Sequence, residues 1–456
     1  MKYKLIGIYL ILQLMISCNK YLDKKNNTSL LIPTSLTDAQ ALLDSYDQMN
    51  SVLTPSFGEN SADDYFLKKE IYNGLALQYQ YNYTWRYYLS TGGSNDWNLG
   101  YKPVYVSNLC LDLLKNIPRN NENTYQWDQV RGAALFYRSY NFLLLLWNYA
   151  KVYDSTTADK DLGIALRMTS DFNVPTTRAT NKESYDQVIK DTKTAIRLLP
   201  DYPELVTRPS KGAAYGLLAR CYLSVCDYKN ALNYADSALR LNSNLMNLNN
   251  DTDIPLGLTA NYPFKRFNKE TIFYTEMDGT PSLFYSPSKS RVDTILYSLY
   301  DVNDLRKIAF FKENVDMYYQ FKGMYSNYAA CFSGIAVDEM LLIRAECLAR
   351  TGQVDNGLID LNTLLQTRYK TATFSPYKNL SQSKALETIL VERRKELTMR
   401  GLRWMDLKRL NKEGANITLK RVEDDGIYTL EPNADYYALP LPDDIIALTG
   451  MPQNSL

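Results

Sequence analysis

Apolar side chains recur at steps of three and four residues along several long stretches of the chain. This period predicts helices over residues 101–115, 127–153 and 184–199, with prolines closing the third. Another helix is expected to begin near Thr37. The pattern is strongest in 127–153, where one helix face collects Ala133, Ala134, Tyr137, Tyr140, Asn141, Leu144 and Leu145.

Residues 211–241 carry a more specific pattern, with small and apolar residues at fixed offsets in two adjacent segments. The offsets are those of a tetratricopeptide repeat, in which small residues let two antiparallel helices pack closely. A weaker copy spans 339–364. Because such repeats stack in series, we expect the helices at 127–153 and 184–199 to belong to the same array. The residues at these offsets in the first copy are Tyr215, Leu218, Ala219, Tyr222, Ala231, Ala235 and Ala238.

Two long segments break the helical pattern. Residues 58–100 mix glycine, asparagine, acids and aromatics, and residues 242–330 are rich in Asn, Pro, Gly and Tyr. Loops of this length are usually functional or disordered, and the aromatic content argues against disorder. A last helix is predicted at about 384–412, and the proline-punctuated C-terminal segment should lie extended on the surface.

The N-terminus has the pattern of a secretion signal. Lys2 and Lys4 precede a short apolar run, and a small residue stands directly before Cys18. Bacterial lipoprotein processing acylates a cysteine in this position, and several acyl chains anchor a protein stably. We therefore predict a signal peptide at 1–17, lipid attachment at Cys18 and a polar tether at 18–36. The alternative is an ordinary signal peptide that merely contains a cysteine.

Composition narrows the chemistry. The chain has 456 residues and a net charge of +1, which becomes about −1 without residues 1–17, so no basic field exists for nucleic acid. It contains no histidine, which excludes histidine bases, Ser-His-Asp catalysis and imidazole metal sites. The cysteines other than Cys18 lack CxxC spacing and predict neither a disulfide framework nor a zinc site. We expect no cofactor and no metal.

Binding groups are sought in the irregular segments, since loops on a rigid scaffold carry most binding residues. Sugar recognition needs an aromatic face for the pyranose and planar acids or amides for its hydroxyls. The chain has 38 tyrosines but only five tryptophans, and core packing is an equally good interpretation for any one aromatic residue. The first candidates are Trp85, Trp97, Asp63, Asp64, Asn95 and Asp96, and the second are Tyr285, Tyr318, Tyr319 and Tyr325.

A charged cluster near the C-terminus has the residue types of an active site. Glu392 and Glu396 share a helix face at a spacing of four, as a pair of catalytic acids could. We interpret the cluster instead as an ion-pair network that fixes the last helix to the repeats. Its other members are Arg393, Arg394, Arg400, Arg403, Asp406 and Arg409.

Ordered motifs along nearly the whole chain then point to one family. After Cys18 comes YLD at 21–23, followed by RGAALFYRSYNFLLLLWNYAKVY at 131–153, SYDQVIKDTKTAIRLLP at 184–200, TRPSKGAAYGLLARCYL at 207–223 and FNKE at 267–270. The most specific motifs are DEMLLIRAECLARTG at 338–352, ETILVERRKELTMRGLRWMDLKRL at 387–410 and PLPDDIIALTGMPQN at 440–454. The chain resembles the SusD/RagB family of outer-membrane nutrient-binding lipoproteins.

The resemblance implies a mainly α fold, with about four tetratricopeptide-like helix pairs and an irregular half laid over them. Residues 37–456 would form one domain, with repeats at about 101–241 and 338–412. It also implies a non-enzymatic lipoprotein on the outer membrane, facing the cell surface, that binds glycans or peptides. Such proteins pass the ligand to a separate TonB-dependent, SusC-like barrel transporter.

Four functions stay open at this point. The leading hypothesis is capture of an oligosaccharide by aromatic stacking and hydroxyl hydrogen bonds. A peptide-binding member of the same family is the second. The third is a carboxylate-dependent glycoside hydrolase, which needs two acids facing each other in a cleft. The fourth is an assembly scaffold, since helical repeats commonly bind proteins.

Overall fold

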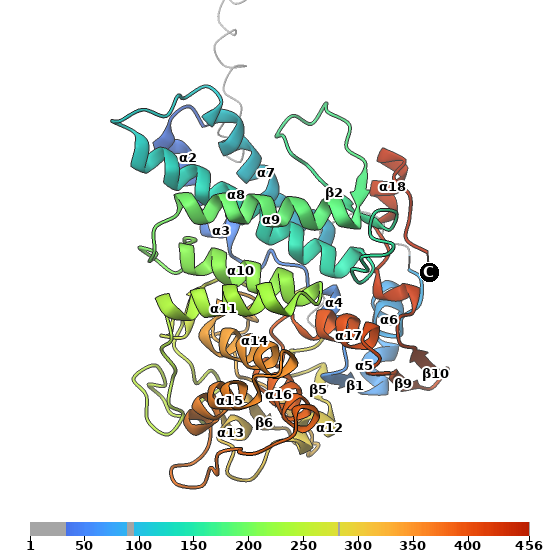
Figure 1. Cartoon of the computed structure of the whole chain (residues 1–456). Helices are drawn as coiled ribbons and strands as arrows, with labels where there is room; N and C mark the ends of the chain where they lie inside the picture. The colour runs from blue at the N-terminus through green and yellow to red at the C-terminus, as the bar shows by residue number, and fades with distance from the viewer. Residues whose placement is uncertain (1–32, 89–94, 281–282, 456) are drawn as a thin grey trace, which may run out of the picture.

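Helices α7 to α11 and α14 to α16 build one side of the molecule as a continuous stack (Figure 1). The computed structural model describes residues 33–88, 95–280 and 283–455. Along the stack α7 packs on α8, α8 on α9, α10 on α11, α11 on α14 and α14 on α15. The helices are α7 (Asp96–Leu114), α8 (Thr124–Tyr149), α9 (Asn181–Leu198), α10 (Lys211–Ser224), α11 (Tyr228–Leu241), α14 (Val337–Arg350), α15 (Val354–Arg368) and α16 (Gln382–Glu396).

Local sequence explains where these helices begin and how closely they pack. Thr180 and Glu183 form a reciprocal capping box at the start of α9, and the Asp227 carboxylate accepts from the amide of Asn230 at the start of α11. On α11 the small residues Ala231 and Ala235 are fully buried, so the neighbouring helices approach closely. The predicted mainly helical, tetratricopeptide-like architecture is confirmed.

The remaining elements form the irregular half, in which every strand pair is two-stranded and antiparallel among the described residues. A second hydrophobic core, separate from that of the helical stack, lies beneath them and includes Tyr65, Tyr83, Phe284, Phe310 and Phe332. The elements are α2 (Leu36–Leu43), α3 (Tyr46–Met49), α4 (Phe57–Ser61), β1 (Tyr65–Leu67), α5 (Lys69–Asn73), α6 (Leu77–Tyr83), β4 (Thr271–Phe273), β5 (Ser290–Val292), α12 (Thr294–Ser298), α13 (Arg306–Phe310), β6 (Phe311–Glu313), β7 (Tyr319–Phe321) and β8 (Ile335–Ala336).

The C-terminal part differs from the sequence prediction. The single helix expected at 384–412 is two helices, α16 and α17 (Arg403–Lys412), separated where Met399 and Gly401 adopt positive φ of 58° and 73°. The segment expected to be extended, residues 436–456, contains α18 (Asp443–Thr449), and a hairpin of β9 (Leu419–Glu423) and β10 (Gly426–Leu430) precedes it. None of the helices in the described part of the chain has the length and hydrophobicity needed to span a bilayer.

Buried ion pairs join the C-terminal helices to the rest of the molecule. Arg306 contacts Glu392 at 2.6 Å and Glu396 at 3.0 Å, and Arg409 grips Glu346 at 2.6 and 2.8 Å. The cluster is therefore a structural network, as interpreted from the sequence. Its other pairs are Arg368–Glu396, Arg368–Glu270, Arg393–Asp406, Arg400–Asp338, Arg394–Asp64 and Arg403–Asp63.

Candidate functional site

A groove of about 860 Å³ lies along α7. Its opposite wall is the loop between β2 (Leu162–Ala165) and β3 (Arg178–Thr180), and α18 and the α2–α3 corner complete the lining. The volume is in the range of sites that hold small ligands. Polar groups from Ser45, Gln48, Asn98 and Lys102 stand among apolar and aromatic side chains.

Aromatic rings line the groove at every fourth residue of α7. Trp97, Tyr101 and Tyr105 follow this spacing, which places them on one face of the helix. The ring centroids of Trp97 and Tyr101 are 4.9 Å apart. Tyr105 stacks on Phe172 of the facing loop at 4.8 Å and 24°, and Phe172 is 73% exposed. The groove thus offers flat apolar faces beside hydrogen-bonding side chains, as recognition of a sugar ring requires.

The facing loop, residues 166–177, is held in shape by side chains. Arg167 donates to the carbonyls of Asp171 and Val174 and to the hydroxyl of Thr176, at 2.6 to 2.7 Å. The Asp112 carboxylate accepts from the backbone amide and hydroxyl of Ser170, both at 2.8 Å. These hydrogen bonds within the protein hold the wall that carries Phe172 in one conformation, which reduces the cost of ordering it on binding.

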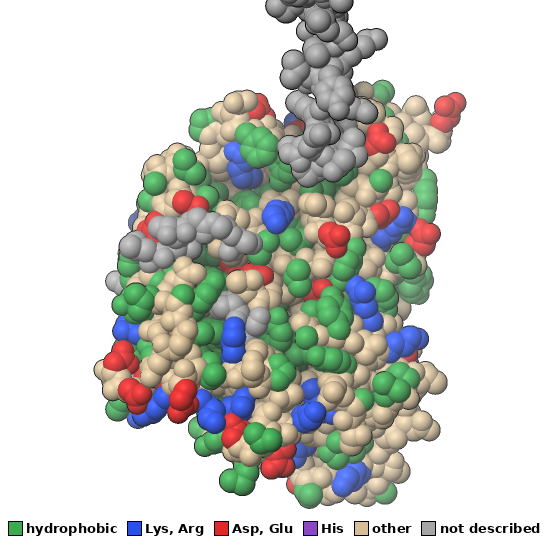
Figure 2. All heavy atoms as spheres, turned by 180° about the vertical axis from the view of Figure 1, so that it is seen from behind, with side chains coloured by type: hydrophobic (Ala, Val, Ile, Leu, Met, Phe, Trp, Pro, Cys, Tyr) green, Lys and Arg blue, Asp and Glu red, His purple; other side chains and the backbone are tan. Residues whose placement is uncertain are grey.

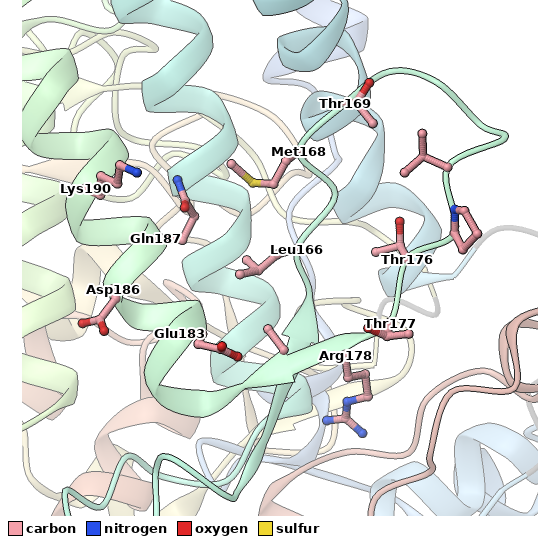
Figure 3. Close-up of a pocket in the computed structure, with 13 residues that line it drawn as sticks. Leu166, Met168, Thr169, Thr176, Thr177, Arg178, Glu183, Asp186, Gln187 and Lys190 are labelled. Carbon is pink, nitrogen blue, oxygen red and sulfur yellow. The ribbon is translucent and has the colours of Figure 1, made fainter.

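The same loop borders a second hollow of about 640 Å³ on its other side. Figure 3 shows α9 supplying Glu183, Gln187 and Lys190 to this hollow, while the strand and loop supply Leu166 and Met168. None of the residues that line it is aromatic. The hollow therefore lacks the stacking surfaces of the groove, and we take the groove as the candidate site.

The candidates Trp85 and Asp64 are buried, and Asp63 is only partly exposed. Trp85 is buried and donates from Nε1 to the Ser61 carbonyl at 2.9 Å. Asp63 accepts two hydrogen bonds from Arg403, and Asp64 accepts one from Arg394. Burial alone would raise the pKa of Asp63, but Arg403 and Arg394 hold it below the ordinary value. The structure does not bring these three residues to the groove.

Asn95 and Asp96 begin α7 and orient Trp97. The Asn95 side chain accepts from the Asn98 amide and caps the helix. Asp96 is fully buried and accepts from the backbone amide of Ser56 at 2.8 Å, which ties α7 to the start of α4. Burial, and then repulsion from the nearby Asp278, raises the pKa of Asp96 well above its ordinary value. Trp97 itself is 5% exposed and lines the groove.

The four tyrosines of the second group fall into two settings. Tyr285 and Tyr325 are buried, and the Tyr325 hydroxyl donates to Glu270 at 2.7 Å. Tyr318 is partly exposed and meets Phe66 edge-to-face, while Tyr319 stacks on Tyr297 with centroids 3.8 Å apart. None of the four lines the groove.

Three aromatic residues of the groove are not among the sequence candidates: Tyr101, Tyr105 and Phe172. A signal for the first two exists, because Trp97, Tyr101 and Tyr105 are four residues apart. The helix predicted from periodicity begins at residue 101 and therefore leaves out Trp97. In the structure α7 begins at Asp96 and includes Trp97. Phe172 lies in a loop and carries no periodic signal.

One buried group of carboxylates has a spacing that could suit a metal ion. Ligand oxygens of Glu270, Asp338 and Glu396 lie within 4.8 Å of one another. Each is already paired with an arginine, Arg368 or Arg400, at 2.8 to 3.1 Å. Their negative charge is thus compensated within the protein, which argues for a structural role.

Together, the stacked helix pairs and the aromatic groove define a helical-repeat protein built to bind a ligand on its surface. Two family models match the chain. One, described as "Starch-binding associating with outer membrane", matches residues 20–223, and the other, described as "SusD family", matches residues 335–448. The chain belongs to the SusD/RagB family. No curated protein matches it.

Solved structures share the fold. A SusD superfamily protein from Bacteroides thetaiotaomicron aligns with a TM-score of 0.75 at 18% identity, covering 92% of this chain and 100% of that one. One from Bacteroides fragilis has a TM-score of 0.71 at 22% identity, covering 92% and 99%. A SusD-like carbohydrate binding protein from Bacteroides vulgatus has a TM-score of 0.65 at 20% identity, covering 92% and 97%.

Proposed function

We propose that the protein is a non-catalytic, outer-membrane lipoprotein that captures an oligosaccharide in the α7 groove and delivers it to a TonB-dependent barrel transporter. The observation that carries the binding part is the aromatic row Trp97, Tyr101, Tyr105 with Phe172 across from it. Amide, hydroxyl and ammonium groups at the rim supply partners for sugar hydroxyls. Membership in the SusD/RagB family supports the surface location and the transporter partner.

Binding is favoured over hydrolysis by the chemistry of the lining. Paired-acid hydrolysis needs two carboxylates across a cleft. Among the described residues that line the groove, none is an aspartate or glutamate. Asp96, the nearest of the candidate acids in sequence to Trp97, is fully buried and bonded to backbone amides of α4.

Isothermal titration of the chain from residue 18 onward, made soluble by Cys18→Ser, tests the proposal. Against a panel of oligosaccharides and a panel of short peptides, we expect saturable binding of at least one oligosaccharide. The matched variant Tyr105→Ala should weaken that binding, because it removes the partner that positions Phe172. Binding of peptides with no response to any glycan would replace this proposal by the peptide-binding alternative.

The anchor is tested separately, because Cys18 lies outside the described residues. In cells, Cys18→Ser should abolish uptake of the bound sugar, since tethering keeps the protein at high local concentration beside its transporter. The purified variant should still bind. Uptake that survives the substitution would show that the tether is dispensable.

A further inference from the structure

A second surface feature, outside the groove lining, centres on Arg266 in the irregular half. The guanidinium carbon of Arg266 lies 4.7 Å from the ring centroids of Tyr46 and Phe267, 5.0 Å from Tyr274 and 5.9 Å from Tyr328. Four rings thus surround one cation and fix its plane. About a third of the Arg266 side chain (34%) remains exposed.

The carboxylate of Glu276 lies next to Arg266 but accepts no hydrogen bond from its guanidinium. Glu276 is fully buried, and its Oε1 accepts from the hydroxyls of Tyr274 at 2.5 Å and Tyr328 at 2.6 Å. The same Oε1 is 3.8 Å from Arg266 Nη2, too far for a hydrogen bond. Glu276 Oε2 and Arg266 Nε have no hydrogen-bond partner among the described residues.

Comparable arginines of this protein are bonded differently. Arg220 donates to both oxygens of Glu339 at 2.7 and 2.6 Å, and Arg409 does the same to Glu346. Both are fully buried. Arg266 combines a rigid aromatic frame with exposure and with an ion pair lacking a hydrogen bond. The plane of its guanidinium is therefore fixed by the rings, and about a third of the side chain reaches solvent although Nε is buried.

The rim of the cluster offers flat surfaces beside this fork. Phe267 is 42% exposed and Tyr328 is 40% exposed, although both rings pack against Arg266. Phe267 holds a φ of +59°, a left-handed conformation that is unfavourable for a bulky residue. Strain of this kind concentrates at sites where a side chain must be presented in one direction.

Helix α3 connects this cluster to the groove. Tyr46 packs on Arg266, while Gln48, two residues further along the helix, lines the groove. The two sites therefore flank the same short helix. Figure 2 shows basic and acidic side chains interspersed on the face opposite the view of Figure 1, without a broad patch of one sign.

We propose that Arg266 is the acid-recognising subsite of an extended site for uronic-acid oligosaccharides. A sugar carboxylate accepts two hydrogen bonds from the outer edge of the guanidinium, and Phe267 and Tyr328 contact the sugar ring. A bidentate arginine–carboxylate pair suits the planar fork better than a neutral hydroxyl, which could take only one of these bonds. This inference rests on the proposed glycan-binding function and specifies its ligand class.

The test is calorimetric titration of the Cys18→Ser chain with four-residue uronates (galacturonate, mannuronate, guluronate and glucuronate oligomers), their methyl esters and neutral tetrasaccharides. We expect at least one uronate to bind roughly tenfold or more tightly than its own methyl ester. Arg266→Gln should remove that preference and leave ester binding within about twofold. The matched control Arg119→Gln, at an exposed arginine paired with Asp128, should change neither.

The outcomes separate the two proposals. If neutral sugars bind and no uronate binds more tightly than its methyl ester, the Arg266 subsite is overturned. The proposed glycan-binding function would remain. Silence of every carbohydrate would overturn both. If Arg266→Gln weakened uronate and ester equally, with an unchanged unfolding midpoint, Arg266 would be no acid-recognising group. A Phe267→Ala variant that also loses the preference for the uronate over its methyl ester would support the subsite independently of Arg266→Gln.

Discussion

Arg306 and Arg266 each lie against tyrosine rings and acids, yet their surroundings differ in one decisive respect. Arg306 is fully buried and hydrogen-bonded to Asp304, Glu392 and Glu396 at 2.6 to 3.0 Å. Arg266 is partly exposed, and its one acidic neighbour, Glu276, is beyond hydrogen-bond distance. The guanidinium of Arg306 donates to three carboxylates of the protein. The guanidinium of Arg266 donates to no carboxylate of the described residues, and we propose that it binds one from a ligand.

The same contrast separates the C-terminal network from the α7 groove. The network contains many titratable groups close together, and in the sequence these residue types resemble an active site. Its groups neutralise one another in the interior, where an unpaired charge would be strongly unfavourable. The groove and the Arg266 cluster hold fewer charges but leave rings and donors accessible. In this fold, the densest cluster of charges stabilises the scaffold, and accessible aromatic rings and hydrogen-bond donors characterise the proposed binding surface.

The largest effect is expected from breaking the network. Arg306→Met should lower the free energy of unfolding by about 3–5 kcal/mol, because it leaves buried carboxylates without their shared cation. Chemical denaturation measures this directly. Lys384→Met on the exposed side of α16, where Lys384 pairs with Glu387, should change stability by less than about 0.5 kcal/mol. Equal effects of the two substitutions would contradict a structural network.

A stabilising substitution is expected at Glu59, a buried acid close to Asp63 and Asp64. Both carboxylate oxygens of Glu59 are buried without a hydrogen-bond partner among the described residues, and burial, then Asp64, raises the pKa of Glu59 well above its ordinary value. The contribution of Glu59 to stability is then greatest below its ordinary pKa of 4.5 and falls as the pH rises above that value. Glu59→Gln should stabilise by about 1–3 kcal/mol at neutral pH. The comparison of unfolding curves at pH 4 and pH 8 should show the gain only at the higher pH.

On the groove side, a substitution should affect binding and spare the fold. Phe172→Ala should weaken oligosaccharide binding about two- to tenfold, because one aromatic contact contributes roughly 0.5–1.5 kcal/mol. Since Phe172 is largely exposed, unfolding should shift by less than about 0.5 kcal/mol. Tyr202→Ala, at another exposed aromatic outside the groove, is the matched control. A loss of stability without a loss of affinity would show that Phe172 stabilises the fold and does not bind the ligand.

The smallest effect concerns the loop that carries Phe172. Burial would raise the pKa of Asp112, but Lys115 and Ser170 lower it to about 2. The loop anchor is therefore fully present above the ordinary pKa of 3.8 and is lost as the pH falls through about 2. At pH 5, Asp112→Asn should speed hydrogen exchange of the Ser170 amide several-fold while leaving global stability within about 1 kcal/mol. Unchanged exchange at Ser170 would mean that Arg167 alone holds the loop.

Periodicity was enough to predict the helical stack, because its repeats bury a regular face of each helix. The break between α16 and α17 was not predictable, since it depends on Met399 adopting a left-handed conformation that only tertiary contacts can hold. The candidate site was found in part. Trp97 lines the groove, but Trp85 does not, because the sequence cannot show which aromatic residues of an irregular segment the main core encloses.

The Arg266 cluster shows the same limit more sharply. Its rings come from Tyr46, Phe267, Tyr274 and Tyr328, which span much of the chain and share no spacing. Only the packing of α3 against the segment before β4 and the loop before β8 brings them together. Contacts between segments this far apart leave no periodic signal in a single sequence.

The most direct test of the central claim is a crystal structure of the Cys18→Ser chain with the tightest-binding oligosaccharide from the titration panel. The account predicts a sugar ring in the groove, in contact with Tyr105 and Phe172 and beside the edge of Trp97. A ligand bound at another surface, with the α7 groove unoccupied, would contradict it.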